Sequence, residues 1–190
     1  MKRLLIAVIG FAIIPFTLTS CTLHWTKDVA KELQPNVLYE SFKTKHINLK
    51  ARSKCSQSPS VNIVNTEIRD ENYLVGEMGA NKIYINPKEM MNHIVDYMKD
   101  AFEKCRISVD NNSTNILNVS MKGAEFKRGF WAVGANIQLK IDIPERQYTD
   151  VYEAEEWTST YHKNAMAYAI HVDTWKIIND PVIQDYILCR

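Results

Sequence analysis

Two stretches of alternating apolar and polar residues constrain the fold more than any other feature of this chain. The first covers residues 117–122 and the second covers residues 135–143. Because successive side chains of a strand point to opposite faces, this alternation predicts strands with one face on a core and the other in water. We expect the two stretches to pair as a long antiparallel hairpin, whose end holds Gly123 to Gly134.

Two longer helices and one short helix are predicted beside this hairpin. Asn86 can cap a helix, Pro87 suits its first position and Glu89 can complete a capping box, so this helix should run to Lys104. Its apolar residues recur at spacings of three and four, which indicates one buried stripe. A second helix, capped by Thr158 or Ser159, should reach about Asn179, and a short one should follow over residues 181–188.

The remaining elements complete the expected fold class. Further strands are predicted over residues 61–68, 82–85, 106–110 and 147–156, with a loop around Gly76 and Gly79. The order of strands and helices predicts an α+β domain in which a largely antiparallel sheet carries its helices on one face.

The N-terminal residues have the pattern of a secretory signal peptide. Lys2 and Arg3 precede 13 uncharged, mostly apolar residues from Leu4 to Phe16. A helix that spans the hydrocarbon core needs about 20 apolar residues, so this run is too short to cross. We therefore expect residues 1–20 to be a signal peptide.

The segment Leu18-Thr19-Ser20-Cys21 resembles the bacterial lipobox. The resemblance implies a diacylglycerol thioether on Cys21, which becomes the acylated N-terminus after cleavage. Thr22, in place of Asp, implies sorting to the outer membrane, with the domain facing the periplasm. Acyl chains contribute about 0.8 kcal/mol per buried methylene, enough to hold a domain without a spanning helix. In the alternative interpretation a plain signal peptide is cut nearby and Cys21 is an ordinary thiol.

Residues 21–59 are expected to form an irregular tether, with a folded domain over residues 60–190. Residues 41–66 contain five basic side chains and no acidic one. A solvated spacer is the favoured interpretation, and contact with an anionic membrane surface is the alternative. Ser and Pro residues just before residue 60 indicate the loop at which the domain begins.

Three further cysteines, Cys55, Cys105 and Cys189, give an odd number in an oxidising compartment, which predicts one disulfide. Cys55 and Cys105 are the favoured pair, since each precedes a strand and both strand starts lie at one end of a right-handed βαβ unit. Cys189 can displace either. No C-x-x-C spacing occurs, so no metal site and no cofactor are expected.

The lipobox is followed by a strand at Val61–Val64, a helix, the long alternating hairpin, a strand at Tyr148–Ala154 and the ending Ile177–Ile183. Together these segments resemble the YajG-like family of Gram-negative lipoproteins. The resemblance covers roughly residues 60–188. It implies a membrane-tethered α+β domain facing the periplasm and supplies no catalytic residues. The basic tether and the extra cysteines depart from the family pattern.

Enzymatic chemistry is not expected. The sequence contains no G-x-S-x-G, H-E-x-x-H, P-loop or G-x-G-x-x-G motif. His93 and Asp96 lie one helical turn apart, but His93 is interpreted as a boundary residue beside the buried stripe. Glu153, Glu155 and Glu156 lie on an expected strand that precedes His162. Because side chains of a strand alternate between its two faces, these three carboxylates should not converge.

A binding module fits the sequence better. The hairpin end carries aromatic and basic residues together, a composition typical of interface hot spots, at Phe126, Lys127, Arg128, Phe130 and Trp131. For the two rings themselves, the interpretation that the sequence favours is that Phe130 and Trp131 fold back over the sheet as cross-strand packing. The net charge of +1 argues against nucleic acid as a partner. The predicted function is a non-enzymatic accessory for an unknown envelope protein, with carriage of a lipid or glycan as the alternative and a periplasmic hydrolase less favoured.

Overall fold

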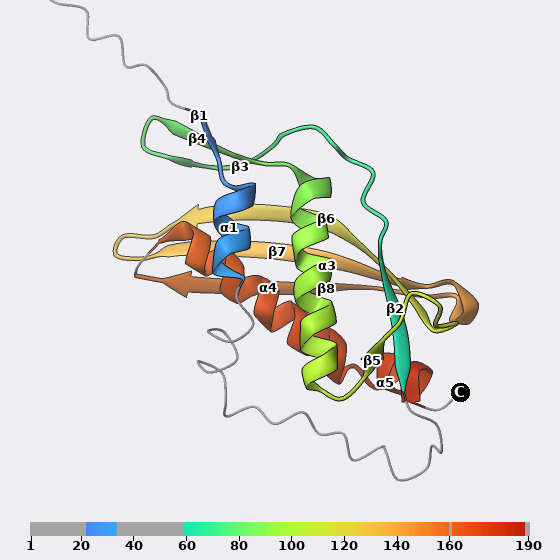
Figure 1. The fold of residues 1–190 in the computed structure, drawn as a ribbon. Helices are drawn as coiled ribbons and strands as arrows, with labels where there is room; N and C mark the ends of the chain where they lie inside the picture. Colours follow the sequence, from blue (N-terminus) through green and yellow to red (C-terminus); the bar gives the residue numbers. More distant parts are fainter. Residues whose placement is uncertain (1–21, 34–58, 160, 189–190) are drawn as a thin grey trace, which may run out of the picture.

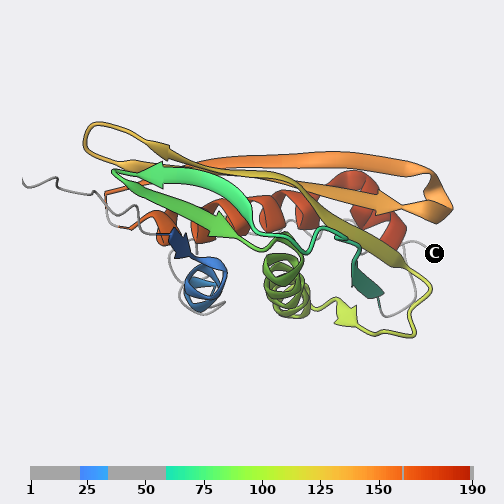
Figure 2. The same cartoon turned by 90° about the horizontal axis from the view of Figure 1, so that it is seen from above.

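The computed structural model describes residues 22–33, 59–159 and 161–188 and confirms the α+β class. A five-stranded sheet has the order β5-β2-β6-β7-β8, and a three-stranded sheet has the order β1-β4-β3. The helices lie on one side of the larger sheet (Figures 1 and 2). The strands are β1 (Thr22–His24), β2 (Ser60–Asn65), β3 (Tyr73–Met78), β4 (Asn81–Ile85), β5 (Ser108–Val109), β6 (Ile116–Arg128), β7 (Val133–Ile143) and β8 (Tyr148–Thr158), and the helices are α1 (Thr26–Glu32), α3 (Pro87–Lys104), α4 (His162–Asn179) and α5 (Pro181–Leu188).

The long hairpin is formed by β6 and β7, as the alternation predicts, and β8 extends it. The apolar positions of β7, from Ile137 to Ile143, are fully buried, while the polar residues between them reach solvent. The connection is tighter than expected. The strands continue to Arg128 and resume at Val133, and the Gly129 amide donates to the Ala132 carbonyl over 2.8 Å.

The edge of β6 is completed by side chains as well as by strands. β2 pairs with β6 in parallel only as far as Asn65, and the register of β6 against β7 shifts between Met121 and Gly123. At this bulge Glu67 Oε2 accepts from the Met121 amide over 3.1 Å, and the guanidinium of Arg69 donates to the Met121 carbonyl. Two side chains thus satisfy the backbone groups that no neighbouring strand reaches.

The helices follow their predicted bounds closely. Helix α3 runs over the predicted residues, and Asn86 Oδ1 accepts from the Glu89 amide over 2.9 Å. Helix α5 also matches its prediction. The predicted cap of α4 is wrong, because α4 begins at His162 and its N-cap residue is Tyr161, whose side chain makes no capping hydrogen bond. Figure 2 shows α4 lying between the sheet and α1, so most of its surface is buried.

Residues 22–33 are not irregular, contrary to expectation. β1 pairs in parallel with β4, and α1 packs against α4 with Val29 fully buried. The apolar stripe of α1 is formed by Trp25, Val29 and Leu33, each four residues from the next. A pattern of three positions is too short to identify a helix from sequence. The folded domain therefore includes residues that precede the expected start at residue 60.

The loop expected around Gly76 is also wrong, because Gly76 lies within β3. A Cβ atom at this position would lie 2.9 Å from the Cβ of Phe126, so the absence of a side chain lets β3 cross close to β6. A glycine inside a strand often marks such a backbone approach. Gly79 does lie in a turn, with a φ of +64°.

Two sets of predicted residues remain as predictions. Cys21, Cys55 and Cys189 lie outside the described residues, and Cys105 is buried where α3 ends. The disulfide and the lipid attachment therefore stay sequence-based. Within the described residues, no helix is long and apolar enough to cross a membrane.

Candidate functional site

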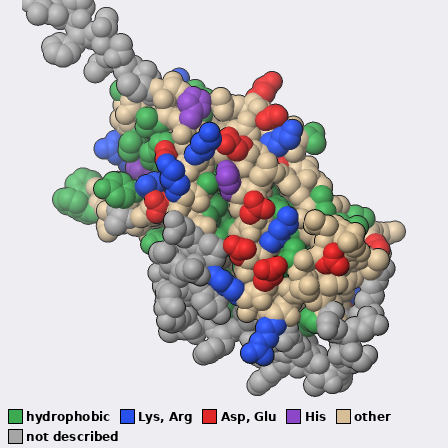
Figure 3. Space-filling view, viewed as in Figure 1, with side chains coloured by type: hydrophobic (Ala, Val, Ile, Leu, Met, Phe, Trp, Pro, Cys, Tyr) green, Lys and Arg blue, Asp and Glu red, His purple; other side chains and the backbone are tan. Residues whose placement is uncertain are grey.

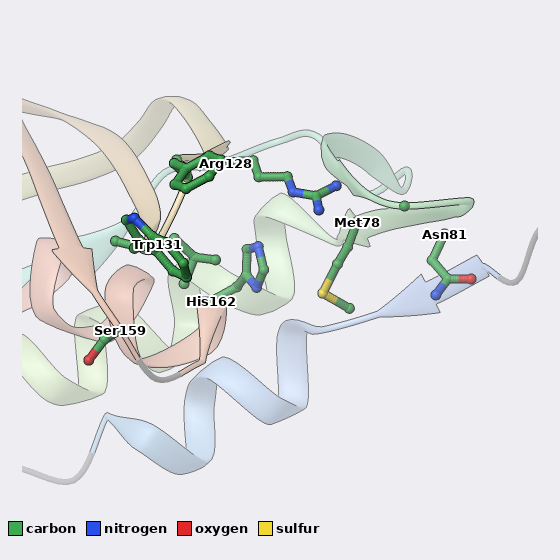
Figure 4. A pocket seen from close by; sticks show the side chains of 11 residues that line it. Met78, Asn81, Arg128, Trp131, Ser159 and His162 are labelled. Atoms are coloured by element: carbon green, nitrogen blue, oxygen red, sulfur yellow. The ribbon is translucent and has the colours of Figure 1, made fainter.

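A groove of about 570 Å³ opens at one end of the domain. The end of the β6–β7 hairpin, the turn between β3 and β4 and the start of α4 enclose it (Figure 4). Its lining consists of Met78, Gly79, Asn81, Arg128, Gly129, Phe130, Trp131, Ala132, Val133, Ser159 and His162. Three segments far apart in the sequence therefore meet at the position where the aromatic and basic residues were predicted.

Phe130 and Trp131 project from the hairpin end into solvent. Phe130 is 89% exposed and Trp131 is 86% exposed. The two rings contact each other edge to face, with centroids 4.7 Å apart. The structure therefore places these aromatics on the surface, and the favoured interpretation, in which they fold back over the sheet, is wrong. Exposed large apolar side chains gathered beside a groove make this end of the domain a candidate interaction site.

Trp157 supports the hairpin from the outer face of the sheet. A Cβ atom at Gly134 would lie 2.8 Å from the indole ring of Trp157, so the ring rests directly on the Gly134 backbone. The Trp157 Nε1–H donates to Glu155 over 2.8 Å. This packing holds the strands that carry Phe130 and Trp131, and it explains the glycine at position 134.

The groove lies over a cluster of three aromatic rings. His162 contacts Trp25 and Phe126 edge to face, with centroids 5.6 and 5.8 Å away. Phe126 is buried in this cluster and cannot contact a partner directly, although the sequence placed it among the binding residues. Burial, and then the positive charge of Arg128, lower the pKa of His162, so its imidazole is neutral at pH 7.

The two predicted cations lie on different faces. Lys127 points to the outer face of the sheet, where it forms an ion pair with Glu155. Arg128 is exposed and lines the groove, as Figure 4 shows. Of the five predicted binding residues, the groove brings together Arg128, Phe130 and Trp131.

The candidate catalytic residues do not converge. Asp96 lies on the exposed face of α3, 3.9 Å from Lys99, and His93 is half-buried on the same helix. Glu153 accepts from Asn136 over 2.6 Å on the outer face of the sheet, away from the groove. Among the described residues, no group of three His, Cys, Asp or Glu side chains is placed to hold a metal ion.

Comparisons with known proteins give one structural likeness. No family model matches the chain, and no curated protein matches it. Among solved structures, the fold is similar to a crystal structure of an uncharacterized protein, with a TM-score of 0.45 and 10% sequence identity. The match covers 64% of this chain and 91% of that one. The fold and groove themselves define an α+β domain with a surface groove at one end.

Sequence reasoning missed residues that complete the groove and the aromatic cluster beneath it. Trp25 lay in the expected tether, and Met78 and Asn81 flank a turn that no pattern connects to the β6–β7 hairpin. The Gly79 turn was the one local signal. Nothing in the sequence indicates which distant segments it meets.

Proposed function

We propose that this protein is a lipid-anchored lipoprotein of the outer membrane, and that its periplasm-facing domain is a non-enzymatic accessory that docks onto an envelope component. The sequence segments that resemble the lipobox and the YajG-like family support the location. The observation that carries the docking role is the pair of exposed aromatic rings at the edge of the groove.

The exposed pair is better explained by binding than by folding. Neither ring contributes much to the core, since both are almost fully accessible. Trp and Arg are enriched among residues that dominate binding energy, and here Trp131 and Arg128 line the same groove. Trp157 holds the strands from behind, so these groups are presented on a supported hairpin.

Replacing Trp131 by Ala should weaken docking without unfolding the domain. We expect a loss of about 2 kcal/mol or more in binding, because truncated hot-spot residues cost this much. The free energy of unfolding should change by less than about 0.5 kcal/mol, since surface substitutions rarely do more. Thermal unfolding and photo-crosslinking in intact cells from position 130 measure the two effects.

Ile68→Ala is the matched control, because Ile68 is as exposed as Trp131 but lies in the loop after β2. It should leave crosslinking from position 130 unchanged. A Trp131→Ala domain that crosslinks as efficiently as the wild type would contradict the docking surface. A large fall in melting temperature would instead assign Trp131 a structural role.

Carriage of a lipid or glycan fragment is the second candidate. The groove volume falls within the range of about 300 to 1,000 Å³ typical of ligand sites, and aromatic rings lie beneath it. A lipid or glycan recovered at a stoichiometric amount from the purified protein, and lost from a Val133→Trp variant that fills the groove, would favour this role over docking.

The anchor itself is tested by Cys21→Ala. The variant should incorporate no labelled palmitate and should move from the membrane to the soluble fraction, because the acyl chains are its proposed attachment. Thr22→Ala, which keeps the acylated cysteine, is the control and should stay with the membrane. If the Cys21→Ala protein is not acylated but is still found in the membrane fraction, the lipid is not what holds the protein at the membrane.

A further inference from the structure

The start of β1 and the groove share one end of the domain. Thr22 pairs with Lys82 in β4, and Lys82 directly follows Asn81, which lines the groove. In Figures 1 and 2, β1 and the ends of the β3–β4 and β6–β7 hairpins all lie toward the same end of the molecule.

Covalent geometry then limits where a lipid on Cys21 can be. Cys21 is joined to Thr22 by one peptide bond, and consecutive Cα atoms are about 3.8 Å apart. The pairing of β1 with β4 fixes Thr22 to the fold, so no long tether separates it from the described domain. An acylated Cys21 therefore brings the bilayer surface against the end of the domain that carries Phe130 and Trp131.

The side chains at this end suit a lipid surface. Trp and Tyr are enriched where headgroups meet hydrocarbon, and both Trp131 and Tyr161 are exposed here. Arg128 is exposed beside them, as are Lys82 and its strand neighbour Glu77. Figure 3 shows hydrophobic side chains projecting at this end, with basic ones close by.

We propose that the bilayer carrying the anchor is what the hairpin end contacts. Phe130 and Trp131 insert at headgroup level, and Arg128 meets lipid phosphates. The domain then stands on the membrane by its hairpin end, with the η2 turn (Pro144–Arg146) and α5 directed away from it. This inference rests on the proposed anchoring through Cys21 and names the component that the exposed aromatics meet.

Quenching by brominated lipid tests the contact directly. The acylated mature protein is reconstituted into phosphatidylethanolamine and phosphatidylglycerol vesicles whose acyl chains are brominated, and its tryptophan emission is compared with that in unbrominated vesicles. The chain has four tryptophans, of which Trp131 is by far the most exposed in the structure. We expect Trp131→Phe to lose at least half of the quenching. Trp175→Phe, which changes a half-buried ring near the C-terminal end of α4, should retain most of it.

The outcomes separate this inference from the function on which it rests. Protein that floats with the vesicles but is quenched equally with and without Trp131 overturns the contact and leaves the anchor intact. Protein that does not float overturns the anchored function and this orientation together. In cells, a photo-crosslinker at position 130 should yield a phospholipid adduct, and a protein adduct in its place overturns membrane contact in favour of a protein partner.

Discussion

Replacing Asp173 by Asn is expected to raise the free energy of unfolding by about 4 kcal/mol at pH 8 and to change it little at pH 4. Asp173 lies on α4 and is fully buried. Among the residues that the structure describes, neither carboxylate oxygen has a hydrogen-bond partner, and Lys176 Nζ lies 3.7 Å from Oδ1. Burial raises the pKa of Asp173 to about 7, although the Lys176 charge opposes the shift.

The pH dependence follows from the direction of this shift. The unfolded chain releases the Asp173 proton near its ordinary pKa of 3.8, whereas the folded protein keeps it until about pH 7. The contribution of Asp173 to the free energy of unfolding is therefore fully present below pH 4 and is lost as the pH rises to 7. Each pKa unit corresponds to about 1.4 kcal/mol, which gives the magnitude over roughly three units.

Urea unfolding from pH 4 to pH 8 measures the effect as a difference between the two proteins. Asp96→Asn is the control, because Asp96 is exposed on α3, and its profile should run parallel to that of the wild type. Parallel profiles for wild type and Asp173→Asn would show that Asp173 is hydrated or paired in the folded state. An Asp173→Leu variant, stabilised at pH 8 in the same direction, checks that burial of charge is the cause.

Glu67→Gln should have the opposite effect, a loss of about 3 kcal/mol at pH 7. Glu67 is buried and accepts four hydrogen bonds, three of them from Arg69 and one from the Met121 amide at the β6 bulge. The hydrogen bond from the Arg69 side chain is the main cause that lowers the pKa of Glu67 to about 2. Its contribution to stability is present above pH 4.5 and is lost as pH falls toward 2.

Unfolding at pH 7 and near pH 2 checks this expectation, since the cost of Glu67→Gln should shrink in acid. Glu71→Gln removes an exposed carboxylate from the same loop and should leave stability unchanged at both values. An equal cost at both pH values would show that Gln fails to fit the site for steric reasons. That result would contradict a stabilising role for the ion pair between Glu67 and Arg69.

The parts of the fold that the sequence predicted are those fixed by local patterns. The β6–β7 hairpin follows from alternation, and α3 follows from Asn86, Pro87 and Glu89 with its apolar stripe. Each signal lies within a short stretch of the chain, residues 86–104 for α3 and residues 117–143 for the hairpin, and needs no knowledge of distant contacts. Phe130 and Trp131 belong to the same hairpin, so the sequence could place them at its end but could not decide whether they are exposed.

What sequence could not supply depends on tertiary contacts. Gly76 resembles a loop residue until β3 is seen to cross β6 at Phe126. Whether Trp131 is core or surface depends on how the hairpin end packs, and alternation ends before it. Helix α4 reads as weakly amphipathic because it is covered on most sides, and the same burial hides Asp173, an acid that sequence would place in solvent.

The pairing of β1 with β4 also sets the order in which the domain can assemble. Thr22 is 60 positions from its partner Lys82, so β1 emerges first during synthesis and has nothing to pair with until β4 exists. Closing a loop of that length costs on the order of 4 kcal/mol in chain entropy, for a strand of three residues. β1 and α1 should therefore dock last in folding and open first, with the fastest hydrogen exchange among the described elements. The pairing that fixes Thr22 beside the proposed anchor is thus expected to form last, once the rest of the domain has folded.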